Sequence, residues 1–399
     1  MKKRIIFVII NMNVGGTEKA LLNMVAEIPK DKYDITILML EEHGEFLNSI
    51  PSEVHVEYLK GYRNLKVILN EPPHIVSLGF LKKGRVIKAF NIVFLHLLSK
   101  ITKDRSIFFK YALRDYPVIN NEHDVAVAYA GPMDFISYFV VNKIAAKKKI
   151  QWIHFDITKI GFNRYFAAKI YNKFDKIFVV SNKGKDKLIN TLPDLKDKIE
   201  TFFNIMSPEF VVEMADEGIG FEDNFSGIRI LTVGRLSKEK GQDLTIPVLA
   251  KLKEDGYNVR WYCVGEGSAR IEYEKLIKEY HVQNDYIFLG ANPNPYPFMK
   301  QCDVYVQPSR HEGYCITLAE ARCFDNPIIS TNFTGASEQI SHNQTGIIVN
   351  FNEQQMYDAI KQLLDDDKLK EKIKGNLQNE VVDTTNEIEK LYKIANSIG

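Results

Sequence analysis

Short apolar runs alternate with stretches of helical periodicity along the chain. The first series of runs comprises Ile5–Ile10, Ile35–Leu40, Val125–Tyr129, Ile150–His154 and Ile177–Val180. The second series comprises Ile228–Val233, Arg260–Val264, Tyr286–Leu289, Val304–Gln307, Pro327–Thr331 and Gly346–Val349. Such runs are typical of strands buried on both faces, and the helices between them would cover the two faces of a parallel sheet. Two such series predict an α/β fold with two doubly wound, Rossmann-like domains.

The predicted domain boundary lies in Ser207–Gly227, where Pro208 and scattered acidic residues interrupt the apolar periodicity. A chain of 399 residues has ample length for two domains. We therefore predict an N-terminal domain at residues 1–206, a linker at 207–227, a C-terminal domain at 228–382 and a C-terminal helix at 383–399 that could cross back to the N-terminal domain. Ligands of such sheets bind at the carboxyl ends of the strands, so two facing domains would enclose a cleft.

Composition narrows the class of protein. Hydrophobic residues make up 45% and charged residues 26% of the chain, with a formal net charge of +1, as in a soluble globular protein. The four cysteines form no C-x-x-C pair, which disfavours a zinc site or a disulfide framework and favours a reducing cytoplasm. The apolar run Ile5–Ile10 follows a basic start, but its six residues are too few for a signal peptide. We therefore expect a cytoplasmic protein.

One segment combines a strand, a loop and the start of a helix with two spaced carboxylates. Residues 308–321 have the sequence PSRHEGYCITLAEA, and seven residues separate Glu312 from Glu320. Free backbone N–H groups and the positive dipole end make a helix N-terminus favourable for phosphate. A carboxylate before such a loop can accept hydrogen bonds from sugar hydroxyls, and one in the first helical turns can reach a ribose diol. The alternative is that both are solvated surface charges.

A second segment places two cations after a glycine turn. Residues 230–241 have the sequence ILTVGRLSKEKG, a buried strand followed by Gly234, Arg235 and Lys240. Arginine can bind phosphate with two parallel hydrogen bonds, and lysine acts as a mobile point charge. Together they could neutralise a departing diphosphate without a metal ion. The alternative is an ordinary solvated basic turn.

Both segments resemble signatures of the family 4 glycosyltransferases (glycosyl transferases group 1), which retain anomeric configuration and have the GT-B fold. The first is similar to the family's E-x7-E signature and the second to its V-G-R-L-x-x-x-K-G pattern. The resemblance implies that Glu312 binds the hydroxyls of a donor sugar, that Glu320 binds the ribose, and that Arg235 and Lys240 bind the diphosphate. The amides of Gly313, Tyr314 and Cys315 would approach the diphosphate, and Gly234, Ile316 and Thr317 would belong to the donor-binding site. The family frequently has Phe-Gly where this chain has Tyr314-Cys315, a mild departure because backbone amides are involved.

Strand ends in the N-terminal half add candidates. Gly15 and Gly16 follow the first strand and permit close approach of a ligand to the backbone, and Thr17 can cap the next helix. By the same resemblance, this turn faces the donor diphosphate. His154 and Asp156 end another predicted strand, where the family often has a histidine that faces the reacting sugar; a core or surface histidine is the alternative. The resemblance adds two weaker positions before the linker, Ser181 and Asn204.

A basic insert interrupts the N-terminal domain. Residues 60–114 contain twelve Lys or Arg against two Asp or Glu, a net charge of +10 that leaves about −9 for the rest of the chain. Apolar residues recur there at helical spacing, at Val86, Phe90, Val93, Phe94, Leu97, Leu98 and Ile101. An apolar stripe with flanking cations suits a helix on an anionic membrane. The alternative is a core-facing helix with a solvated basic face. Aromatic residues do not alternate with the cations along an exposed strand, which disfavours nucleic acid as a partner.

The resemblance implies transfer of a hexosyl unit from a nucleoside diphosphate sugar, UDP-linked by preference, to a hydroxyl of a cell-envelope, polysaccharide or lipid-linked acceptor. Configuration would be retained, and no metal or cofactor beyond the donor is expected, since Arg235, Lys240 and the loop amides would stabilise the leaving phosphate. Two alternatives are a sugar-nucleotide epimerase of GT-B fold and a non-catalytic partner protein of that fold. The presence of all four charged residues disfavours both. If the basic insert binds lipid, the protein would act at the inner face of the membrane.

Overall fold

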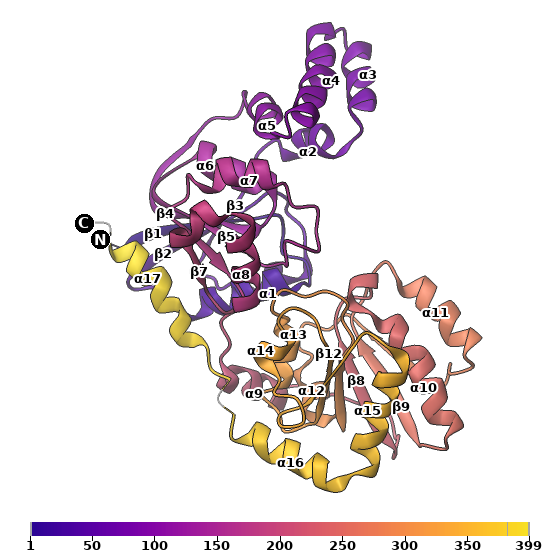
Figure 1. Ribbon diagram of the computed structural model, residues 1–399. Coiled ribbons are helices and arrows are strands. Elements are labelled where there is room, and N and C mark those ends of the chain that lie inside the picture. Colours follow the sequence, from indigo (N-terminus) through magenta and orange to yellow (C-terminus); the bar gives the residue numbers. More distant parts are fainter. Residues whose placement is uncertain (1, 381, 398–399) are drawn as a thin grey trace.

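The computed structural model describes residues 2–380 and 382–397 and shows two α/β domains (Figure 1). The N-terminal domain contains a seven-stranded parallel sheet in the order β3-β2-β1-β4-β5-β6-β7. Its strands are β1 (Lys3–Ile9), β2 (Tyr33–Met39), β3 (His55–Tyr58), β4 (Ile119–Gly131), β5 (Ile144–Ile153), β6 (Lys176–Val179) and β7 (Ile199–Thr201). Its main crossover helices are α1 (Gly16–Glu27), α6 (Asp134–Lys143), α7 (Arg164–Tyr171) and α8 (Asn182–Thr191).

Strand β1 shows why continuous apolar runs form these strands. Ile5, Phe7 and Ile9 belong to one apolar cluster, whereas Ile6 and Val8 belong to another. All five side chains are fully buried. Successive side chains of a strand point to opposite faces of its sheet, and here helices cover both faces, so every position must be apolar.

The C-terminal domain contains a six-stranded parallel sheet in the order β10-β9-β8-β11-β12-β13. Its strands are β8 (Ile228–Val233), β9 (Val259–Val264), β10 (Tyr286–Gly290), β11 (Val304–Gln307), β12 (Ile328–Thr331) and β13 (Ile347–Val349). Its helices are α10 (Thr245–Glu254), α11 (Arg270–Glu279), α12 (Tyr296–Gln301), α13 (Ile316–Ala321), α14 (Ala336–Gln339), α15 (Glu353–Asp365) and α16 (Asp367–Gln378). The predicted fold class, two doubly wound parallel sheets, is confirmed.

The chain crosses between the domains twice. The first crossing contains helix α9 (Pro208–Asp216), which packs against α12 within the segment predicted as a linker. After α16 the chain returns, and Thr384 exchanges hydrogen bonds with Met206 at 3.1 and 2.8 Å. Helix α17 (Glu389–Asn396) then lies against the N-terminal domain (Figure 1), where the ring of Tyr392 stacks on Tyr33 at 4.8 Å. The C-terminal helix therefore ties the end of the chain to the first sheet.

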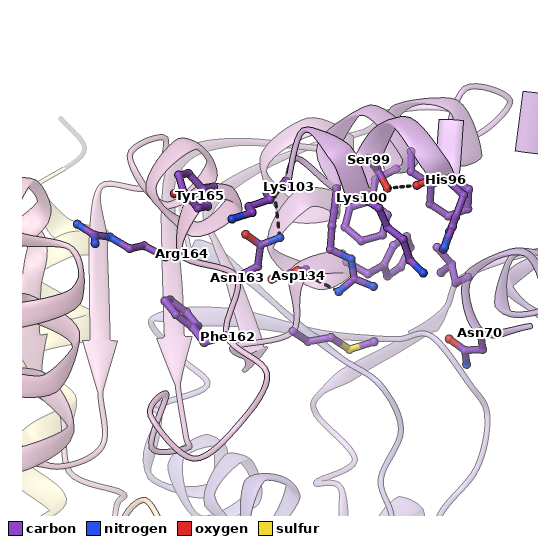
Figure 2. Close-up of a pocket in the computed structure, with 16 residues that line it drawn as sticks. Asn70, His96, Ser99, Lys100, Lys103, Asp134, Phe162, Asn163, Arg164 and Tyr165 are labelled. Carbon is purple, nitrogen blue, oxygen red and sulfur yellow. Dashed lines mark hydrogen bonds and ion pairs between the residues drawn. The ribbon is translucent and has the colours of Figure 1, made fainter. Parts of the chain in front are cut away.

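The basic insert forms four helices that project from the N-terminal domain (Figure 1): α2 (Tyr62–Asn70), α3 (Pro73–Lys82), α4 (Val86–Ile101) and α5 (Ser106–Ala112). Among the residues that the structure describes, no helix has the length and apolar character needed to cross a bilayer. A cavity of about 630 Å³ lies beside α4, between the insert and the residues that precede α6 and α7 (Figure 2). Its walls include His96 and Lys100 of α4, and Asn163 and Tyr165 at the start of α7.

Candidate active site

The predicted site residues follow the carboxyl ends of strands in both domains. In the C-terminal domain, the loop after β8 holds Arg235 and Lys240, and the loop after β11 holds Glu312. In the N-terminal domain, the turn after β1 precedes α1, and His154 directly follows β5. Contacts between these loops, described below, bring the two domains together at one seam.

An ion pair joins the two C-terminal loops. Lys240 Nζ lies 2.5 Å from Glu312 Oε1, and the hydroxyl of Ser309 donates to the same oxygen at 2.8 Å. The two charged side chains are 22% and 11% exposed. Burial opposes the charge of Lys240, but the adjacent carboxylate of Glu312 outweighs it, so the pKa of Lys240 is raised. The ammonium therefore stays charged beside a carboxylate that can still accept hydrogen bonds at its other oxygen.

Arg235 lies in the same loop as Lys240, and its side chain is exposed. Within the described part of the chain, it has no hydrogen bond or ion pair from its guanidinium group. The positive charge of Arg235 acts across the domain seam on Glu18, in the first turn of α1. Burial raises the pKa of Glu18 to about 6, against the opposing effects of its own backbone N–H and of Arg235. Sequence reasoning missed Glu18, although it lies only two residues after the Gly15-Gly16 turn.

Glu320 occupies a buried position on α13 and is 2% exposed. The hydroxyl of Tyr296 donates to its Oε1 at 2.8 Å. Burial raises the pKa of Glu320, and the charge of Lys19 and the Tyr296 hydrogen bond lower it in part. Lys19 of α1 also lies over the Tyr296 ring, 5.1 Å from its centroid. The alternative of a solvent-facing Glu320 is therefore wrong, and sequence reasoning missed Tyr296 and Lys19, its two partners from distant parts of the chain.

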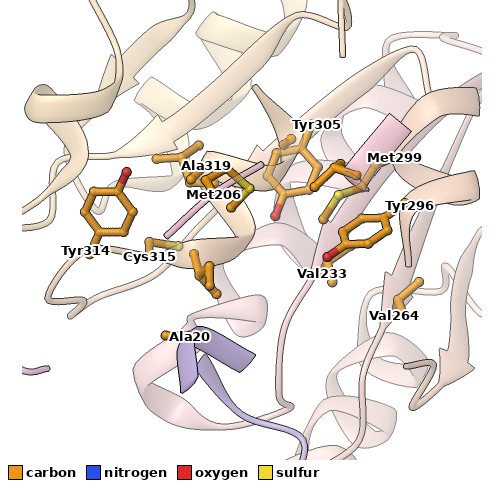
Figure 3. Close-up of a cluster of buried hydrophobic side chains, with 14 of the residues drawn as sticks. Ala20, Met206, Val233, Val264, Tyr296, Met299, Tyr305, Tyr314, Cys315 and Ala319 are labelled. Atoms are coloured by element: carbon orange, nitrogen blue, oxygen red, sulfur yellow. The ribbon is translucent and has the colours of Figure 1, made fainter. Parts of the chain in front are cut away.

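An apolar layer supports this group (Figure 3). Ala20 of α1, Tyr296 of α12 and Ala319 of α13 belong to one continuous cluster of buried side chains. That cluster extends from one face of the N-terminal sheet through the whole C-terminal domain. Because well-packed cores hold side chains in fixed positions, the carboxylate of Glu320 has little freedom to move.

Two glycines lie at contacts across the seam, and one of these contacts requires glycine. A Cβ atom at Gly313 would lie 2.0 Å from the carbonyl oxygen of His154, so no other residue fits there without a shift of the backbone. A Cβ atom at Gly16 would lie 3.7 Å from Cγ2 of Ile316, which is ordinary contact. The turn before α1 therefore faces the start of α13, and the loop after β11 lies against the end of β5. The predicted residues of the two domains meet at this seam.

The loop between β11 and α13 has an unusual backbone at Cys315. Its φ is +68°, a left-handed conformation that is uncommon for a residue with a side chain. The Cys315 thiol lies 3.4 Å from the hydroxyl of Thr317, and that hydroxyl donates to Gln307 at 3.1 Å. The ring of Tyr314 packs near Phe203, 5.9 Å between centroids. The loop is thus held by its side chains, whereas its backbone faces the seam at Gly313.

His154 is buried between aromatic rings. Its ring centroid lies 4.6 Å from that of Tyr129 and 6.4 Å from that of Trp152. Burial lowers the pKa of His154 to about 3, against a backbone hydrogen bond at Tyr129, so the imidazole is neutral near pH 7. Its Nε2 atom has no hydrogen-bond partner in the described structure. This nitrogen is buried, so a ligand hydroxyl would have to displace neighbouring side chains to form a hydrogen bond with it.

Asp156 joins the domains through side-chain hydrogen bonds. Its carboxylate accepts from Lys187 at 2.5 Å and from Thr334 of the C-terminal domain at 2.6 Å. Burial would raise its pKa, but the hydrogen bonds from Lys187, Thr334 and Thr158 hold that pKa well below its usual range. Asp156, a candidate for the cleft, is therefore fully engaged as an ionised interdomain anchor.

The two weaker candidates, Ser181 and Asn204, form structural hydrogen bonds, whereas the predicted cap at Thr17 is absent. Ser181 caps α8, since its hydroxyl accepts from the backbone N–H of Gly184 at 3.2 Å. The Asn204 carbonyl accepts from the hydroxyl of Thr384 at 2.7 Å. The prediction that Thr17 caps α1 is wrong: the helix begins at Gly16, and Gly15, with extended backbone angles, is the N-cap residue.

Solved structures share this arrangement of two domains. HepE of Anabaena, determined with UDP and glucose, superposes with a TM-score of 0.68 at 18% identity, covering 99% of both chains. TarM of S. aureus, a structure that includes UDP, superposes with a TM-score of 0.70 at 15% identity, covering 99% of this chain and 100% of that one. The chain therefore has the GT-B fold of these glycosyltransferases.

The sequence comparisons name the family. Residues 223–380 match the model for glycosyl transferases group 1, so the predicted resemblance of the C-terminal domain to that group is confirmed. The capsular polysaccharide biosynthesis glycosyltransferase CapM of Staphylococcus aureus is 27% identical over 365 residues, covering 86% of this chain and 88% of that protein. The N-acetylgalactosamine-N,N'-diacetylbacillosaminyl-diphospho-undecaprenol 4-alpha-N-acetylgalactosaminyltransferase of Campylobacter jejuni is 31% identical over 215 residues, 53% of this chain. That match spans 57%, little more than half, of this relative's length.

Proposed function

We propose that this protein is a retaining glycosyltransferase that moves a hexosyl unit from a nucleoside diphosphate sugar, UDP-linked by preference, to a hydroxyl group of a cell-envelope glycan or lipid-linked acceptor. The observation that supports it most is the Lys240–Glu312 ion pair, 2.5 Å long, in the loops after strands β8 and β11 of the family-matched domain and beside the exposed Arg235. The relatives named for capsule and undecaprenol-linked sugar transfer support the class of acceptor.

The charges of the site suit a departing diphosphate. A donor that enters the seam would offer its sugar hydroxyls to Glu312 and its phosphates to Lys240 and Arg235. The Lys240 cation, held by Glu312, and the exposed Arg235 would stabilise the negative charge that grows on the leaving phosphate, which is electrostatic catalysis without need of a metal ion. The cation of Lys240 is ready for this role, because Glu312 raises its pKa even though burial opposes its charge.

The other residues would orient the donor. Glu320 is held by Tyr296 at 2.8 Å, which leaves Oε2 free for a ribose hydroxyl. The neutral imidazole of His154 would bind a sugar hydroxyl through its unused Nε2 atom once neighbouring side chains are displaced. The turn at Gly15 and Gly16 presents the first backbone N–H groups of α1, a helix of 12 residues, and such groups at a helix N-terminus favour phosphate.

The test is a panel of UDP-, GDP- and ADP-sugars in EDTA, with binding followed by calorimetry and turnover by release of free nucleotide. We expect binding of one nucleotide class and slow hydrolysis that both Glu312→Ala and Lys240→Ala abolish. Lys300→Ala, an exposed ion-pair residue on α12, is the matched control and should behave like the wild type. Proton NMR of the first sugar released should show the anomer of the donor.

Three outcomes would contradict the proposal. Failure to bind any nucleotide sugar would leave a GT-B-shaped partner protein as the better account. Release of an altered nucleotide sugar without cleavage would indicate an epimerase. Initial release of the opposite anomer would exclude retention while leaving glycosyl transfer intact.

A further inference from the structure

The hairpin of α3 and α4 leaves an unusual amount of apolar surface open. Ile87 is 78% exposed, Ile101 71% and Phe90 67%, values more typical of charged residues. The large apolar side chains of the two helices that are more than 40% exposed are Ile75, Leu78, Leu81, Val86, Ile87, Phe90, Val93, Phe94, Leu97 and Ile101. Contiguous apolar surface of this kind marks a binding surface rather than ordinary protein exterior. We call these ten residues the apolar face of the hairpin.

The apolar face is additional to the packing of the hairpin. The inward side of α4 is already buried at Ala89 and Ile92, each 1% exposed. Phe90 and Phe94, one turn apart on the other side, stack on each other at 5.8 Å with their rings nearly parallel. The alternative that the stripe of α4 faces the protein core is therefore wrong. Figure 1 shows why: α3 and α4 stand outside the sheet, at the end of the N-terminal domain that is remote from the C-terminal domain.

Cations flank the apolar face at both ends of α4. Lys82, Lys83 and Arg85 surround the turn between the two helices, and Lys100 and Lys103 lie at the other end. All five side chains are exposed. In the described structure, none of the five forms an ion pair with a carboxylate. The hairpin therefore presents unbalanced positive charge around an apolar centre.

We propose that this hairpin docks on an anionic phospholipid bilayer, with its apolar face between the acyl chains and its cations at the headgroups. Charge selects this partner. A second copy of the chain would bring the same cations against each other, whereas an anionic bilayer pairs with all of them. A helix of 16 residues, about 24 Å long, lies in the interface and does not cross it, as expected for an amphipathic helix with cations near its ends.

The cavity beside α4 is the part of the surface that would receive a phosphate headgroup (Figure 2). Lys100, Lys103 and Arg105 contribute to its walls, together with aromatic side chains of α5 and of the residues before α7. Of these cations, Arg105 is paired with Asp134 at 3.0 Å. Lys100 and Lys103 stay free of such pairs in the described structure and can bind phosphate at the level of the membrane surface.

The test is sedimentation of the full chain with vesicles of phosphatidylcholine alone or mixed with phosphatidylglycerol. We expect binding to the mixed vesicles that weakens as salt increases. The variant Lys82→Gln/Lys83→Gln/Arg85→Gln should weaken binding roughly 100-fold, because each cation near the surface contributes about fivefold. Phe90→Ser and Phe94→Ser should each weaken it about tenfold. Ile271→Ser, 69% exposed on α11 of the other domain, is the matched control and should bind like the wild type.

A spectroscopic readout separates docking from a folding defect. Phe90→Trp should shift its emission to shorter wavelength with the mixed vesicles and not with phosphatidylcholine alone. Nucleotide-sugar binding should be unchanged in every hairpin variant, since none of these residues lies at the domain seam. Binding that is equal on both vesicles, unaffected by the hairpin changes or equally weakened by Ile271→Ser would overturn the proposal. The proposal would also be overturned if light scattering showed a dimer that Phe90→Ser converts to a monomer, while the wild type bound no vesicles.

Discussion

Replacing Lys240 by Met would test whether one ion pair organises the donor side of the seam. Lys240 Nζ lies 2.5 Å from Glu312 Oε1, and the two side chains are 22% and 11% exposed. Without Lys240, the carboxylate of Glu312 keeps only the Ser309 hydroxyl, at 2.8 Å, among the hydrogen bonds of the described structure. A partly buried carboxylate would then face the seam without a compensating charge.

The magnitude follows from burial. Removal of one partner from a buried ion pair costs about 3–5 kcal/mol of folding free energy, and the residual exposure of both side chains favours the low end, about 3 kcal/mol. Glu312→Gln should cost about 2 kcal/mol, because the lysine is left near Arg235. The double variant removes both charges and should cost about 2–3 kcal/mol. The coupling between the two positions is therefore about 2–3 kcal/mol.

Urea unfolding measures this coupling. Trp152 lies in the N-terminal domain and Trp261 in the C-terminal domain, and both are buried. In a Trp152→Phe background, fluorescence of Trp261 reports unfolding of the domain that contains the pair. Lys300→Met, which removes an exposed ion pair with Asp216, should change the free energy of unfolding by less than about 1 kcal/mol. Additive effects of the two substitutions within about 0.5 kcal/mol, or an equal loss in the control, would refute the argument.

Three further substitutions have clear expected results. Glu18→Gln removes a carboxyl group whose pKa is raised from 4.5 to about 6. The wild type should therefore lose about 2 kcal/mol of stability relative to the variant as pH rises from 4 to 7.5. Unfolding experiments across this pH range measure the difference in stability, and a difference that does not change with pH would contradict the prediction. Tyr296→Phe leaves Glu320 without its 2.8 Å hydrogen bond and should cost about 1–3 kcal/mol in unfolding experiments. The carboxylate of Glu338, in the C-terminal domain, accepts hydrogen bonds from two backbone N–H groups at the start of α8, each at 2.8 Å, and Glu338→Ala should cost about 1 kcal/mol of stability. Amide hydrogen exchange at the start of α8 should become faster in the variant. Unchanged exchange would show that Glu338 does not stabilise this end of the helix.

The sequence was sufficient for the two sheets because parallel strands covered on both faces must be apolar at nearly every position. The same rule explains why some elements could not be predicted from the sequence. All four residues of β3 are exposed at the edge of the N-terminal sheet, so this strand has no apolar run. Strand β7, the last strand of the N-terminal sheet, has only three residues, too few for an apolar run to be recognised. Helix α9 lies in the segment predicted as a linker, and its periodicity is hard to recognise because the apolar residues Phe210 and Val212 lie on its exposed side.

The site was predictable only where its residues are local in the sequence. Arg235, Lys240 and Glu312 lie in strand–turn–helix segments whose spacing is legible from the chain alone. Glu18 and Tyr296 join the site through the packing of α1 and α12 against α13, contacts between residues far apart in sequence. No local pattern marks such residues, because the desolvation that changes their pKa values exists only after the domains have packed.

One short segment of chain leads from the seam to the cavity beside α4. It begins at His154, whose carbonyl contacts Gly313 of the C-terminal domain, and ends at Tyr165, which lines the cavity beside α4. Its Phe155 is 48% exposed and Tyr165 63%. An acceptor held at the proposed membrane surface would have to pass along the N-terminal domain to reach the seam, and this segment extends from the seam to the cavity. Because the residues for docking and for donor binding do not overlap, loss of vesicle binding with intact donor hydrolysis would separate membrane docking from sugar transfer.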